Sequence, residues 1–468
     1  MRSRQPFLLL CALIALCGSL TAALATAAQR DFELRGYSDP TQTTELPFRV
    51  PRLGVNAELM QYLPDELPTH FAQMQAAQIH WVRQFARWDN IEPVRGRYDW
   101  ASWDAVIAAA DAQPELALVV VLVNTPAWAR QDTLLTATAP PTDLQSFAAF
   151  TAAFAARYGQ TVDYYQIWDE PNLSLGWGGL SPRPVEYLAL LQAAYTSIHR
   201  ADSSATVIAA ALAPTAQIGD QTINDWHYLR DLYALGAADF MDAVAAKPYG
   251  FDTAPDDRTV DPAVLNFSRL IGLREVMTAA GDGKSAVWAA NWGWNSLPVG
   301  WTGAPSIWGQ VDSATRTAYT LAALDRAERE WAWLGGMILY HWQPDAPLND
   351  PVWGFALLNP ENTPTPLYGA LVSRARDDTA ASNGMYLAAN PYARYSGVWT
   401  FSALGADIGW LQDSQFTFAF TGRDIALLLR EDDYVGYLYP VIDGQATLVN
   451  ALPSDAAGNP YVILTSDT

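Results

Sequence analysis

One stretch decides how this chain folds: Tyr164-Tyr165-Gln166-Ile167-Trp168-Asp169-Glu170-Pro171-Asn172. Its first five residues have strand character, because aromatic and β-branched side chains favour strands. Pro171 lacks a backbone N–H and therefore ends the hydrogen-bonded ladder. The acidic pair Asp169 and Glu170 is thus expected at the C-terminal end of a strand, where a βα-barrel carries its functional groups. The alternative is an acidic turn after a buried strand.

The surrounding sequence favours the barrel. Short apolar runs alternate with helical patterns over residues 48–375, which is typical of βα units and a parallel sheet. Eight strands are predicted, at residues 53–56, 81–85, 116–123, 164–168, 206–211, 243–246, 286–290 and 337–340. Helices are predicted between them, for example at residues 144–158, 184–200 and 314–333. Eight such units favour an α/β fold of the closed (β/α)8 (TIM) barrel type over an open doubly wound sheet, and no G-x-G-x-x-G loop for a nucleotide occurs.

A change of pattern follows the barrel. Residues 376–383 are polar and are predicted to be a linker, and residues 384–468 to be a small, antiparallel, sandwich-like β module. Its clearest strands are predicted at residues 416–420, 425–429 and 461–464. Asp443-Gly444 is a typical hairpin turn. The strands are fewer than a sandwich usually contains, which suggests a module that is cut short.

The first 28 residues are predicted to be an export signal. Arg2 and Arg4 precede an uncharged run, and Ala25-Thr26-Ala27 offers a small-residue cleavage site. The run is long enough to span a bilayer, so an uncleaved anchor is the alternative. Residues 29–47 are a polar lead-in to the barrel. We therefore expect a secreted or cell-envelope protein, in contact with a membrane only if the segment is uncleaved.

The amino-acid composition limits the classes of partner that this protein is expected to bind. The net charge of −21 argues against nucleic acid, because no basic stripe is available for phosphates. The 19 tryptophans, 21 tyrosines and 16 phenylalanines suit sugar rings, although most such side chains form core. Both cysteines, Cys11 and Cys17, lie in the export segment, so we expect neither disulfides nor a thiolate metal site in the mature chain. Lys247 and Lys284 are the only lysines.

Polar and aromatic residues follow the predicted strands and should converge on one rim of the barrel. These residues are Arg83, Trp88, Asn124, Trp128, Asp169, Glu170, Asn172, Lys247, Tyr249, Asn291, Trp294 and Trp342. Tryptophans, amides and a carboxylic acid on one rim are typical of a sugar site. A tryptophan at a strand end can equally be packing.

The order and spacing of these motifs resemble a glycoside hydrolase of clan A, closest to the family 39 and family 5 branches. The resemblance covers about residues 50–375. The motifs that carry it are the strand of Arg83, Trp88…Glu92-Pro93…Gly96…Tyr98-Asp99-Trp100, Thr125-Pro126-Ala127-Trp128, Trp168-Asp169-Glu170-Pro171-Asn172, Lys247-Pro248-Tyr249, Trp292-Gly293-Trp294-Asn295 and Trp353-Gly354. The terminal module resembles the accessory β-sandwiches of carbohydrate-active enzymes.

The resemblance implies chemistry by two carboxylates about 5 Å apart, an acid/base and a nucleophile, without cofactor or metal. It assigns the acid/base to Glu170 and implies substrate-binding roles for the other rim residues. The nucleophile belongs in a Glu-x-Gly-Trp setting, which here reads Asn291-Trp292-Gly293-Trp294. A neutral asparagine cannot form the glycosyl ester.

Two further departures lie nearby. The residue before the acid/base is typically Asn and is Asp169 here, and a usual His-Pro-Tyr reads Lys247-Pro248-Tyr249. Both carboxylates therefore follow the same strand. A lysine beside them would favour their charged forms, which works against a general acid. The structural alternative for Lys247 is an ion pair with Asp169.

Three functions remain open at this point. The first is an exported glycoside hydrolase acting on an oligo- or polysaccharide by a modified route. An inverting route would need a base about 6.5–9.5 Å from Glu170, and Glu58, Asp345 and Asp350 are candidates. Assistance by a substrate group would also remove the need for a protein nucleophile. The second function is glycan binding without turnover, and the third is a purely structural role in the cell envelope.

Overall fold

The structure, a computed structural model, describes residues 4–36, 53–113, 115–331 and 333–377 continuously. Beyond these it describes 380–381, 386, 388, 390, 392–396, 399–402, 405–408, 414–429, 437–447 and 461–465. Residues 1–375 with 400–407 form one compact unit, and residues 376–399 with 408–468 form another.

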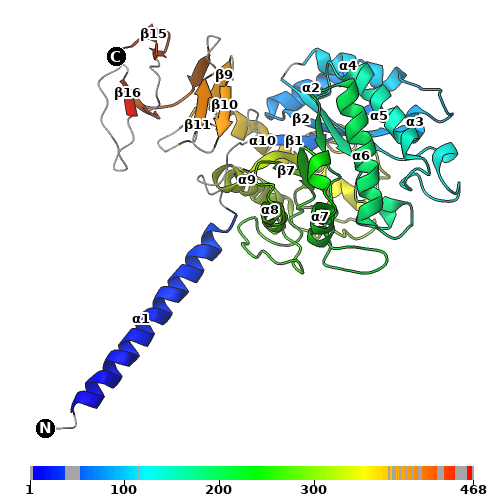
Figure 1. The fold of residues 1–468 in the computed structure, drawn as a ribbon. Coiled ribbons are helices and arrows are strands. Elements are labelled where there is room, and N and C mark those ends of the chain that lie inside the picture. Colours follow the sequence, from blue (N-terminus) through cyan, green and yellow to red (C-terminus); the bar gives the residue numbers. More distant parts are fainter. Residues whose placement is uncertain are drawn as a thin grey trace. The chain divides into compact units, whose positions relative to one another are not determined.

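The first unit contains a closed barrel of eight parallel strands surrounded by helices (Figure 1). The strands are β1 (Leu53–Asn56), β2 (Trp81–Arg87), β3 (Ala117–Val123), β4 (Tyr164–Ile167), β5 (Thr206–Ile208), β6 (Ala243–Ala246), β7 (Ala286–Trp292) and β8 (Leu334–Leu339). Closure is made by β1, in which Gly54 pairs with Trp81 of β2 and Leu53 pairs with Met337 of β8. The prediction of a TIM barrel is confirmed.

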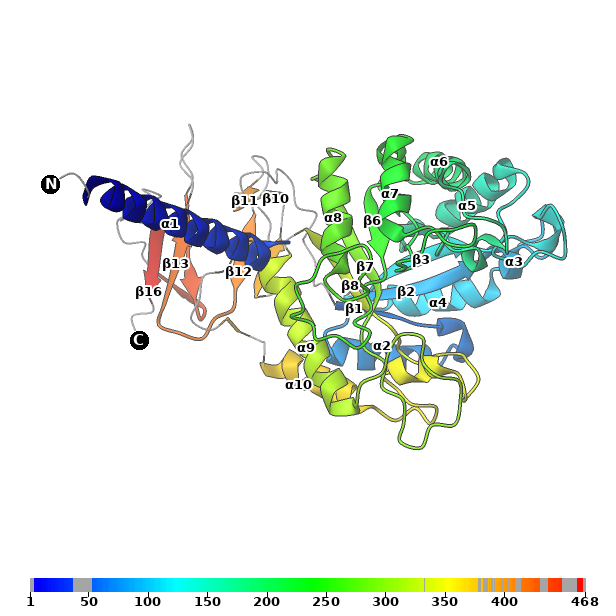
Figure 2. The ribbon, with the colours of Figure 1, turned by 90° about the horizontal axis from the view of Figure 1, so that it is seen from below.

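Helices cover the outside of the barrel in both views (Figures 1 and 2). They are α2 (Leu67–Ala76), α3 (Trp88–Ile91), α4 (Ala101–Asp111), α5 (Leu144–Tyr158), α6 (Pro184–Ala201), α7 (Asp225–Ala234), α8 (Arg269–Ala279), α9 (Ser313–Glu330) and α10 (Pro366–Asp377). Each helix buries an apolar face against the strands; in α5, for example, Phe147, Phe150 and Phe154 are fully buried.

The predicted elements differ from the observed ones at their ends. The helix predicted to reach residue 333 ends at Glu330, and the strand predicted to reach residue 211 ends at Ile208. β4 ends at Ile167, one residue earlier than predicted, because Trp168 has φ +71° and leaves the extended conformation.

An aromatic cluster fills the barrel interior. The ring of Trp81 lies edge-on to Tyr164 and to Trp288, with both centroid distances 4.7 Å. Glycines make room for these rings: a Cβ on Gly335 would lie 2.5 Å from the Trp288 indole nitrogen. The packing of the Trp288 ring therefore requires a glycine at position 335 of β8.

The described residues between 393 and 465 form small antiparallel sheets, as predicted. The strands are β9 (Ala393–Ser396), β10 (Trp399–Ser402), β11 (Gly405–Ile408), β12 (Gln415–Phe418), β13 (Asp424–Leu428), β14 (Val441–Ile442), β15 (Gln445–Ala446) and β16 (Tyr461–Thr465). In the described residues they pair two by two, β9 with β12, β13 with β16, β14 with β15 and β10 with β11. Asp443 and Gly444 both have positive φ in the turn between β14 and β15, as the hairpin prediction requires.

The N-terminal segment is helical: α1 spans Arg4–Leu34 and so includes the first residues of the predicted lead-in. The rest of that lead-in, residues 37–47, and part of the predicted linker lie outside the described residues. Among the described residues, no helix has both the length and the apolar character needed to cross a membrane.

The packing around Trp288 gives a test of the fold. We expect Gly335→Ala to lower the free energy of unfolding by roughly 1–3 kcal/mol, because the added methyl group overpacks the barrel interior. Urea unfolding followed by tryptophan fluorescence measures the change. Gly369→Ala is the matched control, since Gly369 lies in α10 with open space around it and alanine is the better helix former. Equal effects of the two substitutions would contradict the packing role.

Candidate active site

Arg83 lies at the centre of the predicted site. It is the third residue of β2, and its side chain is fully buried inside the barrel. Its Nε donates to Gln166 Oε1 at 3.0 Å, and Nη1 donates to Asn56 Oδ1 at 2.7 Å and to Asn291 Oδ1 at 3.1 Å. Nη2 donates to Asp169 Oδ1 at 2.8 Å. One planar guanidinium thus fixes side chains that come from β1, from β4 and its C-terminal end, and from β7.

Lys247 joins the two carboxylates that follow β4. Its Nζ donates to Asp169 Oδ2 and to Glu170 Oε1, at 2.7 Å in each case. The ion pair between Lys247 and Asp169 suggested by the sequence is present, and it extends to Glu170. With Arg83 the group contains two cations and two carboxylates, so its formal charge is balanced.

Exposure distinguishes the members of this group. The side chains of Arg83 and Lys247 are 0% and 4% exposed, that of Asp169 is 15% exposed and that of Glu170 is 32% exposed. Glu170 is therefore the member that a ligand from solution reaches. Asp169 is the counter-ion of both cations.

The ion pairs set the protonation of the buried pair. Burial alone would raise the pKa of Asp169, but Lys247 and Arg83 outweigh it and hold the pKa below its usual range. Burial alone would lower the pKa of Lys247, but the charges of Asp169 and Glu170 raise it above its usual value. Asp169 is therefore ionised and Lys247 protonated at neutral pH.

The backbone at the end of β4 is bent to present this pair. Trp168 and Glu170 have φ of +71° and +51°, a region that non-glycine residues adopt only where surrounding structure holds them. Glu170 N donates to Ala211 O at 3.0 Å. A Cβ on Gly176 would lie 2.1 Å from Glu170 O, so only glycine allows this close approach.

Asn291 ends the network on the side of β7. Its Oδ1 accepts from Arg83, and its Nδ2 donates to the Tyr249 hydroxyl at 3.0 Å. Burial raises the pKa of Tyr249, and the charge of Glu170 raises it further, so the phenol stays protonated. Asn291 is 4% exposed.

Three of the predicted binding tryptophans are core residues. Trp88, Trp294 and Trp342 are buried, and their indole N–H groups donate to Glu92 Oε2, Thr253 O and His70 Nδ1. Trp88 is stacked on Phe150, with a centroid distance of 5.5 Å. No ring face remains for a sugar, so the packing alternative holds for these three.

Trp128 and Asn124 lie on the chain that follows β3. Trp128 is half-buried, donates to Glu92 O at 2.9 Å and has the Arg95 guanidinium 5.4 Å above its ring. Asn124, with φ +68°, donates to Asp89 Oδ1 at 3.1 Å. Both are partly accessible, which fits binding positions at the rim.

Asn172 has a positioning role. It is fully buried, its Nδ2 donates to Ala213 O and Ile223 O, and its Oδ1 accepts from Ala213 N at 2.9 Å. The side chain thereby ties the turn after β4 to the segment after β5.

The candidate bases lie on other parts of the rim. Glu58 Oε1 and Oε2 each accept from Arg87, at 3.1 Å, so this carboxylate is already paired. Asp350 caps the short helix η5 (Pro351–Phe355) by accepting from Val352 N. Asp345 is exposed.

Several residues of the site were not predicted from the sequence. Asn56 and Gln166 hold Arg83, and each was visible as a lone polar residue in an apolar strand. Trp308 lies 6.0 Å from Tyr249, within an aromatic group that also includes Tyr340 and Phe355. Trp308 comes from a long loop without any motif, so no signal pointed to it.

His341, which follows β8, is a further buried polar residue. Burial lowers its pKa to about 3, with Arg83 adding to the effect, so the ring is neutral at ordinary pH. Among the described residues, no group of three or more His, Cys, Asp or Glu is placed to hold a metal ion.

Several solved structures share this fold. A family 39 glycoside hydrolase from Bacteroides cellulosilyticus WH2 matches with 16% identity, 89% of this chain, 81% of that chain and a TM-score of 0.54. A monomeric β-xylosidase from Caulobacter crescentus CB15 matches with 18% identity, coverage of 85% and 79%, and a TM-score of 0.53. A GH5_18 protein from Streptomyces cattleya, solved in complex with GlcNAc, matches with 16% identity. The match covers 71% of this chain and 82% of that chain, with a TM-score of 0.50.

The barrel therefore shares its fold with solved glycoside hydrolases of families 39 and 5. No protein-family model matches the sequence. No curated protein matches it either. At these identities the comparison establishes the fold, and the roles of the residues rest on the geometry of the site.

The buried ion pairs predict a large effect of Asp169→Asn. At pH 7 we expect it to lower the free energy of unfolding by roughly 3 kcal/mol, because Arg83 and Lys247 lose a buried negative partner. Urea unfolding measures the change. Asp104→Asn, which breaks an exposed pair with Arg157, is the control and should cost at most about 1 kcal/mol.

The same variant tests the lowered pKa of Asp169. A carboxylate whose native pKa is depressed stabilises the fold above its unfolded pKa, about 3.9, and loses that contribution as the pH falls through the native pKa. The stability difference between the unmodified chain and Asp169→Asn should be constant above about pH 5 and shrink below about pH 4. A difference that grows on acidification would contradict the assignment.

Proposed function

We propose that this protein is an exported glycoside hydrolase-like protein that acts on the O-glycosidic bonds of an oligo- or polysaccharide. Glu170 serves as the general acid/base. The observation that carries the proposal is the position of Glu170, a solvent-accessible carboxylate beside a buried ionic network at the C-terminal ends of barrel strands. The shared fold supports a carbohydrate as the substrate, since the matching structures include glycoside hydrolases.

Asn291 is assigned to the nucleophile position. Its surroundings suit a carboxylate, because Arg83 donates to it and the protonated Tyr249 hydroxyl lies 3.0 Å away. With an amide there, no glycosyl ester forms, so hydrolysis follows a non-standard route. In an inverting route, water attacks the anomeric carbon while a base on the opposite rim accepts its proton. Of the candidate bases, Asp345 is exposed to solvent, whereas Glu58 is paired with Arg87.

Lys247 bears on the role of Glu170 as a general acid. A general acid must carry a proton before it can protonate a leaving oxygen, and Oε1 of Glu170 accepts a hydrogen bond from the Lys247 ammonium group at 2.7 Å. The proposal of export is supported by the N-terminal segment, which has basic residues, an uncharged run and a small-residue cleavage site.

A second function, glycan binding without turnover, is supported by one specific observation. Each group that conventional catalysis needs is replaced or paired: position 291 is an amide, and the Glu170 carboxylate is bonded to Lys247. Such a site keeps polar and charged contacts for a sugar and has no covalent route for cleavage.

Turnover depends on Glu170 if the first function is correct. We expect Glu170→Gln to lower kcat by about 100-fold or more on a panel of aryl glycosides and polysaccharides, because the amide cannot transfer a proton. The panel includes xylosides, since one matching structure is a β-xylosidase. Reducing-end release measures the rate, and Glu361→Gln, at an exposed turn, is the control. An unmodified chain that binds sugars in calorimetry and cleaves none would establish the second function.

The position of Asn291 gives a gain-of-function test. The double variant Asn291→Glu with Asp169→Asn moves one carboxylate to the other side of Arg83 and keeps the number of carboxylates constant. We expect it to hydrolyse aryl glycosides at least about tenfold faster than the unmodified chain, through a covalent intermediate. Asn291→Gln with Asp169→Asn is the control, because it has the same size and no nucleophile. Equal rates for the two double variants would contradict the assignment of position 291.

A further inference from the structure

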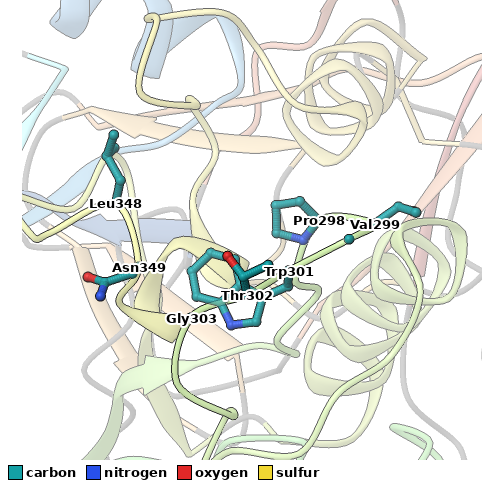
Figure 3. Close-up of a pocket in the computed structure, with 8 residues that line it drawn as sticks. Pro298, Val299, Trp301, Thr302, Gly303, Leu348 and Asn349 are labelled. Atoms are coloured by element: carbon teal, nitrogen blue, oxygen red, sulfur yellow. The ribbon is translucent and has the colours of Figure 1, made fainter.

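A pocket of about 330 Å³ lies between the loops that follow β7 and β8 (Figure 3). Both loops leave the C-terminal ends of their strands, the same rim that carries the ionic network. The lining residues are Pro298, Val299, Gly300, Trp301, Thr302, Gly303, Leu348 and Asn349. The volume is at the lower end of the range for small-ligand sites.

Hydrogen bonds and close packing hold the two loops together. Ala304 N donates to Asn349 O at 3.3 Å, and the Trp301 indole nitrogen donates to Ala304 O at 2.8 Å. A Cβ on Gly303 would lie 2.3 Å from Asn349 O and 2.4 Å from the Trp301 ring. The glycine therefore lets the backbone pack directly against the indole, which fixes the ring in the pocket.

The lining suits an uncharged sugar. It contains no ionisable side chain, and Trp301 is partly exposed, so its indole offers apolar area to one face of a pyranose. Thr302 and Asn349 are exposed and supply a hydroxyl and an amide, which can bond sugar hydroxyl groups. An anionic ligand would find no cation here.

The loop after β7 also borders the ionic network. Further along this loop, Trp308 packs at 6.0 Å from the ring of Tyr249, and the Tyr249 hydroxyl accepts from Asn291. Ser296 N donates to Gly354 O at 2.9 Å and Gln310 N to Asp252 Oδ1 at 2.8 Å, which anchors both ends of the loop. One anchored loop thus contributes to the surroundings of Asn291 and forms the Trp301 pocket.

We propose that the Trp301 pocket binds one sugar unit of a neutral oligo- or polysaccharide whose other units reach Glu170. The proposal rests on the proposed function and specifies its substrate: a chain of several uncharged units, rather than a monosaccharide glycoside. The pocket adds affinity only for chains long enough to extend from the ionic network to the loop.

Calorimetric titration of the full chain with neutral oligosaccharides tests the proposal. The probes are xylose, glucose and mannose oligomers of two and of six units, used with the unmodified protein and with Glu170→Gln, which keeps the probe intact. For the series that binds, we expect the six-unit probe to bind about tenfold more tightly than the two-unit probe. Trp301→Ala should remove this advantage and leave two-unit binding unchanged, while Trp301→Phe should retain most of it.

Two further variants isolate the pocket from general effects on folding. Gly303→Ala places a methyl group against the indole and should reduce six-unit binding as Trp301→Ala does. Leu134→Ala removes an exposed apolar side chain from the loop after β3 and should change neither probe. Six-unit binding that survives Trp301→Ala, or an equal loss for both lengths, overturns the proposal and leaves the proposed function standing. Absence of binding by every oligosaccharide overturns both.

Discussion

The buried guanidinium of Arg83 is the constraint on which the rest of the site depends. A charge enclosed by a barrel is tolerated only where hydrogen bonds and a counter-ion replace water. Asn56, Gln166 and Asn291 provide neutral acceptors, and Asp169 provides the negative charge. Because these side chains belong to β1, β7 and the end of β4, the arginine also fixes the relative positions of these strand ends.

This arrangement decides which groups are free to act on a ligand. Asp169 is committed to two cations, and Lys247 is committed to two carboxylates. If either side chain left its ion pairs, a buried charge would remain without a partner, which costs several kcal/mol. Glu170 is held by one bond to Lys247 and is about a third exposed, so it combines a fixed position with access from solution.

The sequence predicted the architecture because a barrel strand is buried on both sides and each helix has one apolar face. These patterns are local, so all eight strands could be located, and 243–246 and 144–158 were predicted to the residue. Several other ends were not predicted, since they depend on contacts between distant segments. β4 ends where Trp168 and Glu170 adopt positive φ, and that conformation requires Gly176 to lie against the backbone of Glu170.

The site was predictable to a similar degree. Arg83, Lys247 and the acidic pair were identified, because charged residues within or directly after a buried strand are rare. The tryptophans were not separable into core and surface: Trp88 is core only because α5 places Phe150 over its ring. Trp308 and Trp301 belong to a loop whose course is set by hydrogen bonds to the loops after β6 and β8. Sequence patterns carry no information on such pairings.

Asn291, Asp169 and Lys247 are linked through shared hydrogen-bond partners. Asn291 and Asp169 accept hydrogen bonds from the same guanidinium, from Nη1 and Nη2 respectively. A carboxylate at either position can therefore neutralise the charge of Arg83. With a neutral amide at 291, Arg83 needs an anion elsewhere, and Asp169 supplies it. That second anion lies beside Glu170, and two adjacent carboxylates repel each other unless a cation joins them. Lys247 is that cation, and it donates to both. These side chains thus form one charge-balanced arrangement around Arg83, in which each charge is paired with an opposite one.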